Sequence, residues 1–151
     1  MSAISTFHDA IETWMLGLFA APTYKRLVNP YTIEADASLN LNRGWAFLIG
    51  PKTPANLTTG RYWQFNVNLQ IIQTISQKGT DRDITIRQTA EKLLLEDQFT
   101  MLDSLRTTTT FDTKVWNLEY TDDNGLEFVF TEQQNYYKII TNLTAIISEG
   151  C

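Results

Sequence analysis

The spacing of apolar residues predicts a helix at the start of the chain. A helix over residues 4–19 would collect on one side Ile4, Phe7, Ile11, Trp14 and Leu18. Thr6 with Asp9 three residues later resembles a capping box for this helix. Pro22 prevents the helix from continuing, and the turn signals over residues 23–43 predict an extended crossing with room for a short strand.

A second and longer helix is predicted over residues 83–105. Its broad apolar stripe consists of Ile86, Ala90, Leu93, Leu94, Met101, Leu102 and Leu105. Thr80 with Asp83 three residues later predicts a cap at its start. The threonines at 107–110 favour extended chain after its end, because their branched side chains crowd a helix.

The clearest pattern in the chain is the alternation over residues 62–75. It predicts a strand with one buried face, formed by Trp63, Phe65, Val67, Leu69 and Ile71. At about 3.3 Å per residue this strand would span roughly 45 Å, so it either bends or projects beyond its own domain. A short apolar run at 44–50 predicts a buried strand, and residues 51–61 predict a long loop between the two.

The last third of the chain predicts three more strands. Residues 114–120 and 126–130 flank the segment Asp122-Asp123-Asn124-Gly125, and Asn-Gly is the strongest short signal for a hairpin turn. Residues 136–148 are rich in isoleucine and threonine and predict a long closing strand.

These elements together predict one α+β domain over residues 1–151. We expect a mostly antiparallel sheet of four to five strands with two helices packed on one face. A chain of this length can bury a core of its own. We expect that core to contain Trp63, Phe65, Val67, Leu69, Leu94, Leu102, Trp116, Leu118 and Phe128.

The charge balance argues against binding to nucleic acid. Lysine and arginine number 12 against 17 aspartate and glutamate, which gives a net charge of −5. Phosphate binding needs clustered cations, and no basic run here exceeds two residues. This charge is still compatible with a surface along which DNA passes without being bound. No apolar run reaches the ~18–20 residues of a membrane span, and residues 1–21 resemble an amphipathic helix rather than a signal peptide, so we expect a cytoplasmic protein without a membrane partner.

No combination of residues predicts catalysis, a cofactor or a metal site. A catalytic triad needs a base beside its nucleophile, and the single histidine, His8, lies in the first turn of the predicted helix. Cys151 is the single cysteine, so the chain lacks enough cysteine and histidine ligands for a Cys/His zinc site. Asp122, Asp123 and Glu127 lack the spacing of an EF-hand loop. We therefore expect a protein that is not an enzyme.

Two segments are harder to explain by folding alone. The polar side of the long strand carries the amides Gln64, Asn66, Asn68 and Gln70. Solvated strand faces usually carry charges, whereas amides both donate and accept, which suits a contact with another subunit. An ordinary hydrated face is the alternative. The predicted loop at 51–61 is long and poor in charge. One interpretation is that it projects towards a partner, and the alternative is an ordinary mobile surface loop.

The layout resembles the tail terminator proteins of long-tailed bacteriophages, in particular those of siphophages with flexible tails. The resemblance spans most of the chain and lies in the order of its elements, without a single diagnostic motif. It comprises the first helix, the strand GWAFLIG, the long loop into YWQFNVNLQIIQTI, the central helix, the hairpin at 122–125 and the closing strand YYKIITNLTAII. The stretch between the first helix and the first clear strand is longer than expected for that family.

The resemblance implies a structural protein that forms a ring, expected to be hexameric, at the head-proximal end of the virion tail. Such a ring is assembled in the host cytoplasm, caps the tail tube, ends its polymerisation and joins the filled head. Its partners would be further copies of itself, the tail tube protein and a neck or head-completion protein, while DNA passes through without specific binding.

Two surfaces become contact candidates under this resemblance. Subunits would meet through Gln64, Asn66, Asn68 and Gln70, or through the ends of the two long strands. By its position in the topology, the loop would face the tail tube, with contact candidates Lys52, Thr53, Asn56, Thr58, Thr59 and Arg61.

Two other functions stay open on the sequence. A neighbouring neck or head-completion protein, a head–tail connector, would share the size and the acidity. A small ligand-binding domain, or an enzyme of unfamiliar type, would instead be a monomer with a deep polar pocket.

Overall fold

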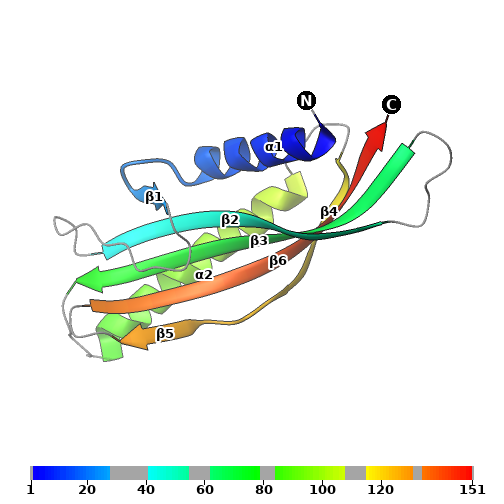
Figure 1. Ribbon diagram of the computed structural model, residues 1–151. Helices are drawn as coiled ribbons and strands as arrows, with labels where there is room; N and C mark the ends of the chain where they lie inside the picture. The colour runs from blue at the N-terminus through cyan, green and yellow to red at the C-terminus, as the bar shows by residue number, and fades with distance from the viewer. Residues whose placement is uncertain are drawn as a thin grey trace.

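The computed structural model describes residues 2–27, 41–54, 62–78, 84–107, 115–130 and 134–150. This part of the chain forms one six-stranded sheet and two helices (Figure 1). The strands follow the order β1-β2-β3-β6-β4, and β5 also pairs with β6. β1 is parallel to β2, and the other pairs are antiparallel. The predicted α+β class with a mostly antiparallel sheet is confirmed, with six strands in place of four to five.

The first helix, α1 (Ala3–Leu18), matches the predicted range 4–19 to within one residue at each end, but its cap differs. Its N-cap is Ser2, whose side chain accepts a hydrogen bond from the backbone N–H of Ser5 at 3.2 Å. Thr6 lies inside the helix, where its hydroxyl donates to the backbone oxygen of Ser2 at 3.1 Å. The predicted Thr6–Asp9 capping box is therefore wrong, because Ser2, one turn earlier, is the N-cap and accepts from the free N–H of Ser5.

The crossing contains the short strand β1 (Tyr24–Arg26), which pairs with the start of β2 (Leu41–Pro54). The predicted strand at 44–50 lies within β2, but residues 51–54 of the predicted loop also belong to it. A bulge after Ile49 takes up the extra residues, and the ladder resumes with Lys52 opposite Val67. Prolines are tolerated here because β1 pairs with β2 only up to Trp45. Residues 55–61 of the predicted loop lie outside the described part.

The two longest strands, β3 (Tyr62–Lys78) and β6 (Gln134–Gly150), have 17 residues each. They pair with each other from end to end. The predicted long alternating strand and the predicted closing strand are thus confirmed, and each is longer than predicted. In Figure 1 their right-hand end extends beyond both helices.

The predicted hairpin at residues 122–125 is wrong. β4 (Val115–Asp123) and β5 (Glu127–Phe130) both pair with β6, so the chain continues in one direction along that strand. Gly125 has a φ of 73°, and its N–H donates to Oδ1 of Asp123 at 2.8 Å. This local turn makes a kink rather than a reversal, because the long edge of β6 offers backbone partners on both sides of it.

The second helix, α2 (Ile84–Thr107), matches the predicted range, and its predicted cap at Thr80 and Asp83 lies outside the described residues. Buried residues of each helix share an apolar cluster with odd-numbered residues of β3 and β6, whose side chains lie on what we call the inner face of these strands. α1 and Met101 of α2 share one cluster with Val67, Leu69 and Ile71. Ala90 and Leu94 of α2 share a second cluster with Ile75, Tyr137 and Ile139.

The apolar interior is thus divided, in contrast to the single core that the sequence predicts. Phe65, Val67, Leu69, Leu102 and Leu118 belong to the first cluster, while Leu94 and Phe128 belong to the second. The side chains of Trp63 and Trp116 lie outside the described part. Polar residues of α2 and the sheet are buried between the two clusters, and they include Gln73, Asp97, Gln98 and Thr141.

Candidate functional site

The outer face of the sheet, opposite the inner face, carries the amides that the sequence singles out. Gln64, Asn66, Asn68 and Gln70 alternate with the inward residues of β3, and all four are half-buried. Their partners on β6 are Ser148, Ile146, Thr144 and Asn142. We call these eight residues the amide face.

Charge is absent from this surface along the two central strands. Residues 64–77 of β3 and 139–148 of β6 include no Asp, Glu, Lys or Arg. The acidic residues lie on the margin formed by β4, where Glu119 faces Thr144 and Asp122 faces Asn142. Asn142 donates its amide N–H to Oδ1 of Asp122 at 2.7 Å, so the margin and the amide face are joined by a direct hydrogen bond.

The other half of the outer face is already covered. Leu27, which follows β1, forms a small cluster with Ala46 and Ile72. Gly44 makes this close approach possible, because a Cβ at that position would lie 2.8 Å from Cδ2 of Leu27. Ile72 and Thr74 are buried on this half, whereas the amides of the same strand are only half-buried.

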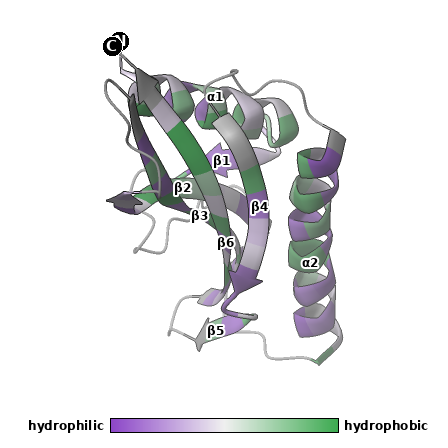
Figure 2. Cartoon of the chain, turned by 90° about the vertical axis from the view of Figure 1, so that its right-hand side faces the viewer, coloured by the Kyte–Doolittle hydropathy of each residue, from purple (hydrophilic) through white to green (hydrophobic). Residues whose placement is uncertain are grey.

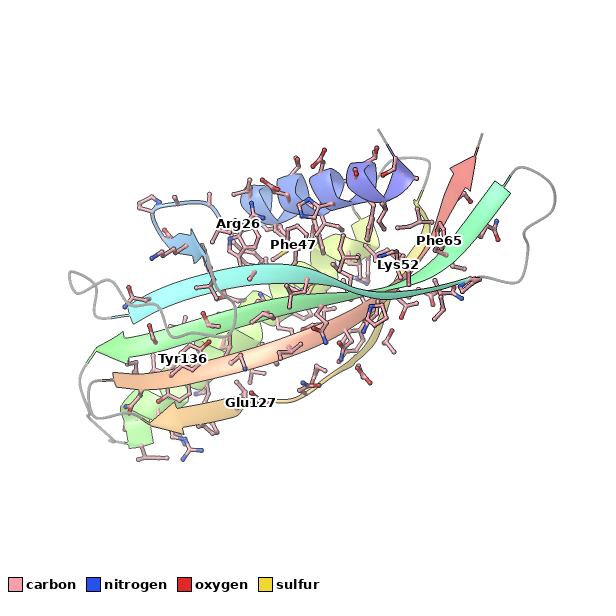
Figure 3. The ribbon with its side chains drawn as sticks, in the orientation of Figure 1. Arg26, Phe47, Lys52, Phe65, Glu127 and Tyr136 are labelled. Carbon is pink, nitrogen blue, oxygen red and sulfur yellow. The ribbon has the colours of Figure 1, made fainter. Side chains whose placement is uncertain are left out.

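The tail-tube contact candidates are split by the structure. Lys52 and Thr53 lie in β2, opposite Val67 and Asn66, rather than in a loop. Lys52 lines a shallow depression beside the start of α1, together with Ile4, Ser5, His8, Asp9 and Ile49. Figure 3 places Lys52 and Phe65 towards the projecting end of the sheet. Asn56, Thr58, Thr59 and Arg61 lie outside the described residues.

A buried polar contact that the sequence does not predict joins α2 to β1 and β2. Asp97 of α2 is 5% exposed and accepts hydrogen bonds from the Tyr24 hydroxyl at 2.9 Å and from Nε of Arg43 at 3.1 Å. A second guanidinium nitrogen of Arg43 pairs with the same carboxylate. Burial, and then donation to Asp97, raises the pKa of Tyr24 to about 12. An acidic residue inside the apolar stripe of a predicted helix was the signal for this contact.

A second polar contact fixes the kink between β4 and β5. Gln98 donates its amide to Oδ2 of Asp123 at 3.1 Å and to the Thr141 hydroxyl at 3.0 Å. The Tyr120 hydroxyl donates to Oδ2 of Asp123 at 2.7 Å. This last bond, then the N–H of Gly125 and the amide of Gln98, holds the pKa of Asp123 below its usual range. Asp123 therefore acts as a structural acceptor.

Potential metal ligands converge at one place in the described part of the chain. Nδ1 of His8 lies 3.7 Å from Asp9 and 4.0 Å from Glu12 on the surface of α1. Glu12 is already ion-paired with Arg26 at 2.9 Å, which places a competing cation at the group. Figure 3 shows Arg26 beside Phe47, beneath α1. We assign no chemistry to this group.

Within the described residues, neither helix is long and apolar enough to cross a membrane. The sequence matches no protein-family model and no curated protein at a significant level.

Proposed function

We propose that this chain is a structural subunit of a bacteriophage tail, a tail terminator whose copies form a ring, expected to be hexameric, on the end of the tail tube. The ring would end tube polymerisation and present the surface that joins the head. The observation that carries the proposal is the amide face, an uncharged and half-exposed surface along two strands of 17 residues each.

The composition of the amide face supports burial against another subunit. Charged groups are depleted in the centre of protein interfaces, because removing a charge from water is costly. Amides and hydroxyls lose less on burial and can exchange hydrogen bonds with a partner backbone or side chain. Ile146 adds apolar area to the same surface. We therefore assign Gln64, Asn66, Asn68 and Gln70 to subunit contacts.

The edges of the sheet support a contact by faces rather than by added strands. β2 carries Pro51, Lys52, Pro54 and a bulge in the stretch that lies past β1. β4 has two bulges and the acidic residues Glu119 and Asp122. Prolines, charges and bulges all deter the pairing of a further strand on an edge. Neighbouring copies would therefore meet through side chains.

One element of the family resemblance is lost, since residues 122–125 form a kink rather than a hairpin. The first helix, the strand pair β2–β3, the central helix and the long closing strand keep the predicted order. The proposal rests on these elements and on the amide face.

Co-assembly with the tail tube protein of the same phage tests the terminator role against a neck protein. We expect tubes that polymerise in the presence of this protein to stop growing and to carry a ring at one end in electron micrographs. A neck protein would leave tube growth unchanged and bind tubes that are already capped. Continued tube growth at every ratio of the two proteins would contradict the terminator role.

A further inference from the structure

The exposed apolar side chains of the molecule are concentrated on α2 and β4. Five large apolar side chains are exposed among the described residues, and four of them belong to these two elements: Ile84, Leu95, Phe99 and Tyr120. Phe99 is 68% exposed, the largest fraction of the five. Single exposed apolar residues are ordinary, but several on neighbouring elements indicate a surface that another molecule covers.

A groove runs between the second half of α2 and β4, and Figure 2 shows the two elements alongside each other. It has a volume of about 460 Å³ and is lined by Leu102, Leu105, Arg106, Leu118, Glu119 and Tyr120. We call it the α2–β4 groove. Leu118 and Tyr120 stand opposite Ala145 and Leu143 of β6, which belong to the inner face. The apolar part of the groove therefore lies on the opposite side of the sheet from the amide face.

The apolar surface continues from the groove along α2. Leu95, Phe99 and Leu102 are spaced by four and three residues, so they lie on one side of the helix. This is the spacing through which one helix packs against another. An added strand is a poorer occupant, because two bulges interrupt β4 and acidic residues lie along its edge. The shape of the surface therefore favours a helix that lies along α2 and over β4.

The side of the groove that β4 forms is acidic. Glu119 and Asp122 are exposed carboxylates, and β4 contains no lysine or arginine. Glu119 has no cationic partner among the described residues. Such a side attracts a cationic partner and repels an acidic one.

α2 contributes no net charge beside the groove. Arg106 is paired with Asp103. Lys92 and Glu96, which are exposed one turn apart on the helix, carry opposite charges. The negative charge of β4 is therefore not offset by α2.

The helices of this chain do not fit the groove by charge. α1 carries Asp9 and Glu12 and contains no lysine or arginine. α2 has four acidic residues against three basic ones. A second copy of this chain would therefore bring a further acidic helix to an acidic site, so charge complementarity favours a different protein.

We infer that the α2–β4 groove binds a basic amphipathic helix of a different protein, a contact that goes beyond the proposed ring. The apolar residues of that helix, spaced by three and four, pack against Phe99, Leu102 and Tyr120. Its lysine or arginine side chains lie over β4, beside Glu119. Apolar contact supplies the buried area of such a complex, and the opposite charges set the orientation of the bound helix.

Two synthetic peptides test the inference on the full-length protein. Each has about 18 residues, which is five helical turns, with leucine at spacings of three and four. The remaining positions are alanine and lysine in one peptide, and alanine and glutamate in the other. In titrations followed by fluorescence anisotropy, the lysine peptide should bind about tenfold more tightly than the glutamate peptide.

Four variants locate the binding site. Phe99→Ser leaves the net charge unchanged and should weaken binding of the lysine peptide about tenfold, whereas Leu16→Ser, at a site 46% exposed on α1, should bind like the wild type. Glu119→Lys should also weaken binding about tenfold. Asp9→Lys changes the net charge equally but away from the groove, so its effect should be small. Circular dichroism checks that each variant is folded.

Three results would overturn the inference. The first is equal affinity for the two peptides, or no binding of the lysine peptide at about 1 mM. The second is a Phe99→Ser variant that binds the lysine peptide as tightly as the wild type. The third is self-association of the wild type that Phe99→Ser abolishes in sedimentation velocity, because the groove would then be filled by a second copy.

Discussion

Leu94 and Phe65 differ in burial, which makes them a test of the packing at the residue scale. Leu94 is fully buried, whereas Phe65 is only partly buried near the projecting end of β3. Leu94→Ala should lower the free energy of unfolding by about 2–5 kcal/mol, since it removes buried methyl groups and leaves a cavity. Phe65→Ala should cost clearly less. Urea denaturation of both variants checks this, and equal losses would contradict the assigned burial.

Tyr24 gives a prediction for alkaline pH. An unfolded tyrosine ionises near pH 10, but the pKa of Tyr24 in the folded protein is raised to about 12. The neutral hydroxyl therefore stabilises the fold fully below pH 10, and this contribution is lost as the pH rises from about 10 to about 12. The stability difference between the wild type and Tyr24→Phe should shrink over that window. Titration of the tyrosine ring carbons by NMR locates the ionisation, and a value for Tyr24 near 10 would refute the contact with Asp97.

At the scale of elements, Gly17 and Gly44 differ in the space that surrounds them. Gly17 has no neighbour within 4 Å of an added Cβ, whereas Gly44 would place a Cβ against Leu27 and Thr74. Gly17→Ala, within α1, should stabilise the protein by about 0.4–1 kcal/mol, because alanine restricts the unfolded chain. Gly44→Ala should destabilise it by about 1–3 kcal/mol through overpacking between β2 and Leu27. Thermal unfolding of the two variants measures both changes in stability. A Gly44→Ala variant more stable than the wild type would contradict the close contact of Leu27 with β2 on the outer face.

The predictability of these elements depended on how local their signals are. Both helices and β3 could be predicted from their apolar periods, β2 from a short apolar run, and β6 from its isoleucine and threonine content. The kink at Gly125 was misread because Asn-Gly permits a left-handed residue in either a hairpin or a kink, and the choice depends on the distant edge of β6. The extension of β2 to Pro54 was missed for a similar reason, since prolines signal a loop unless the strand is at an edge.

The candidate site was predictable only in part. The amides share one face because of the strand period alone, so their juxtaposition could be predicted. Contacts such as Arg43 with Asp97, 54 positions apart, follow from the tertiary packing of α2 on the sheet. The groove that Leu102 and Leu105 of α2 form with Leu118 and Tyr120 of β4 likewise depends on tertiary packing, which no local pattern specifies.

At the scale of the whole molecule, the net charge of −5 gives a prediction about DNA. If six copies surround the DNA path, the lumen should be neutral or acidic, because every exposed lysine or arginine would be repeated six times and would hold phosphates. We expect no binding to duplex DNA at physiological salt, measured by fluorescence anisotropy with the assembled protein. Tight, salt-sensitive binding would contradict the role of the ring as a conduit.

The mass of the assembled protein, measured by sedimentation next to the variant Asn66→Lys/Asn68→Lys, tests the central claim most directly. For the wild type we predict a species of six 17.3 kDa chains, about 104 kDa, at sufficient concentration. The double variant places like charges on the amide face, so it should remain folded, by circular dichroism, yet assemble poorly. Normal rings from the double variant would show that the amide face is not a subunit contact, and a wild type that remains at 17.3 kDa at every concentration would contradict the ring.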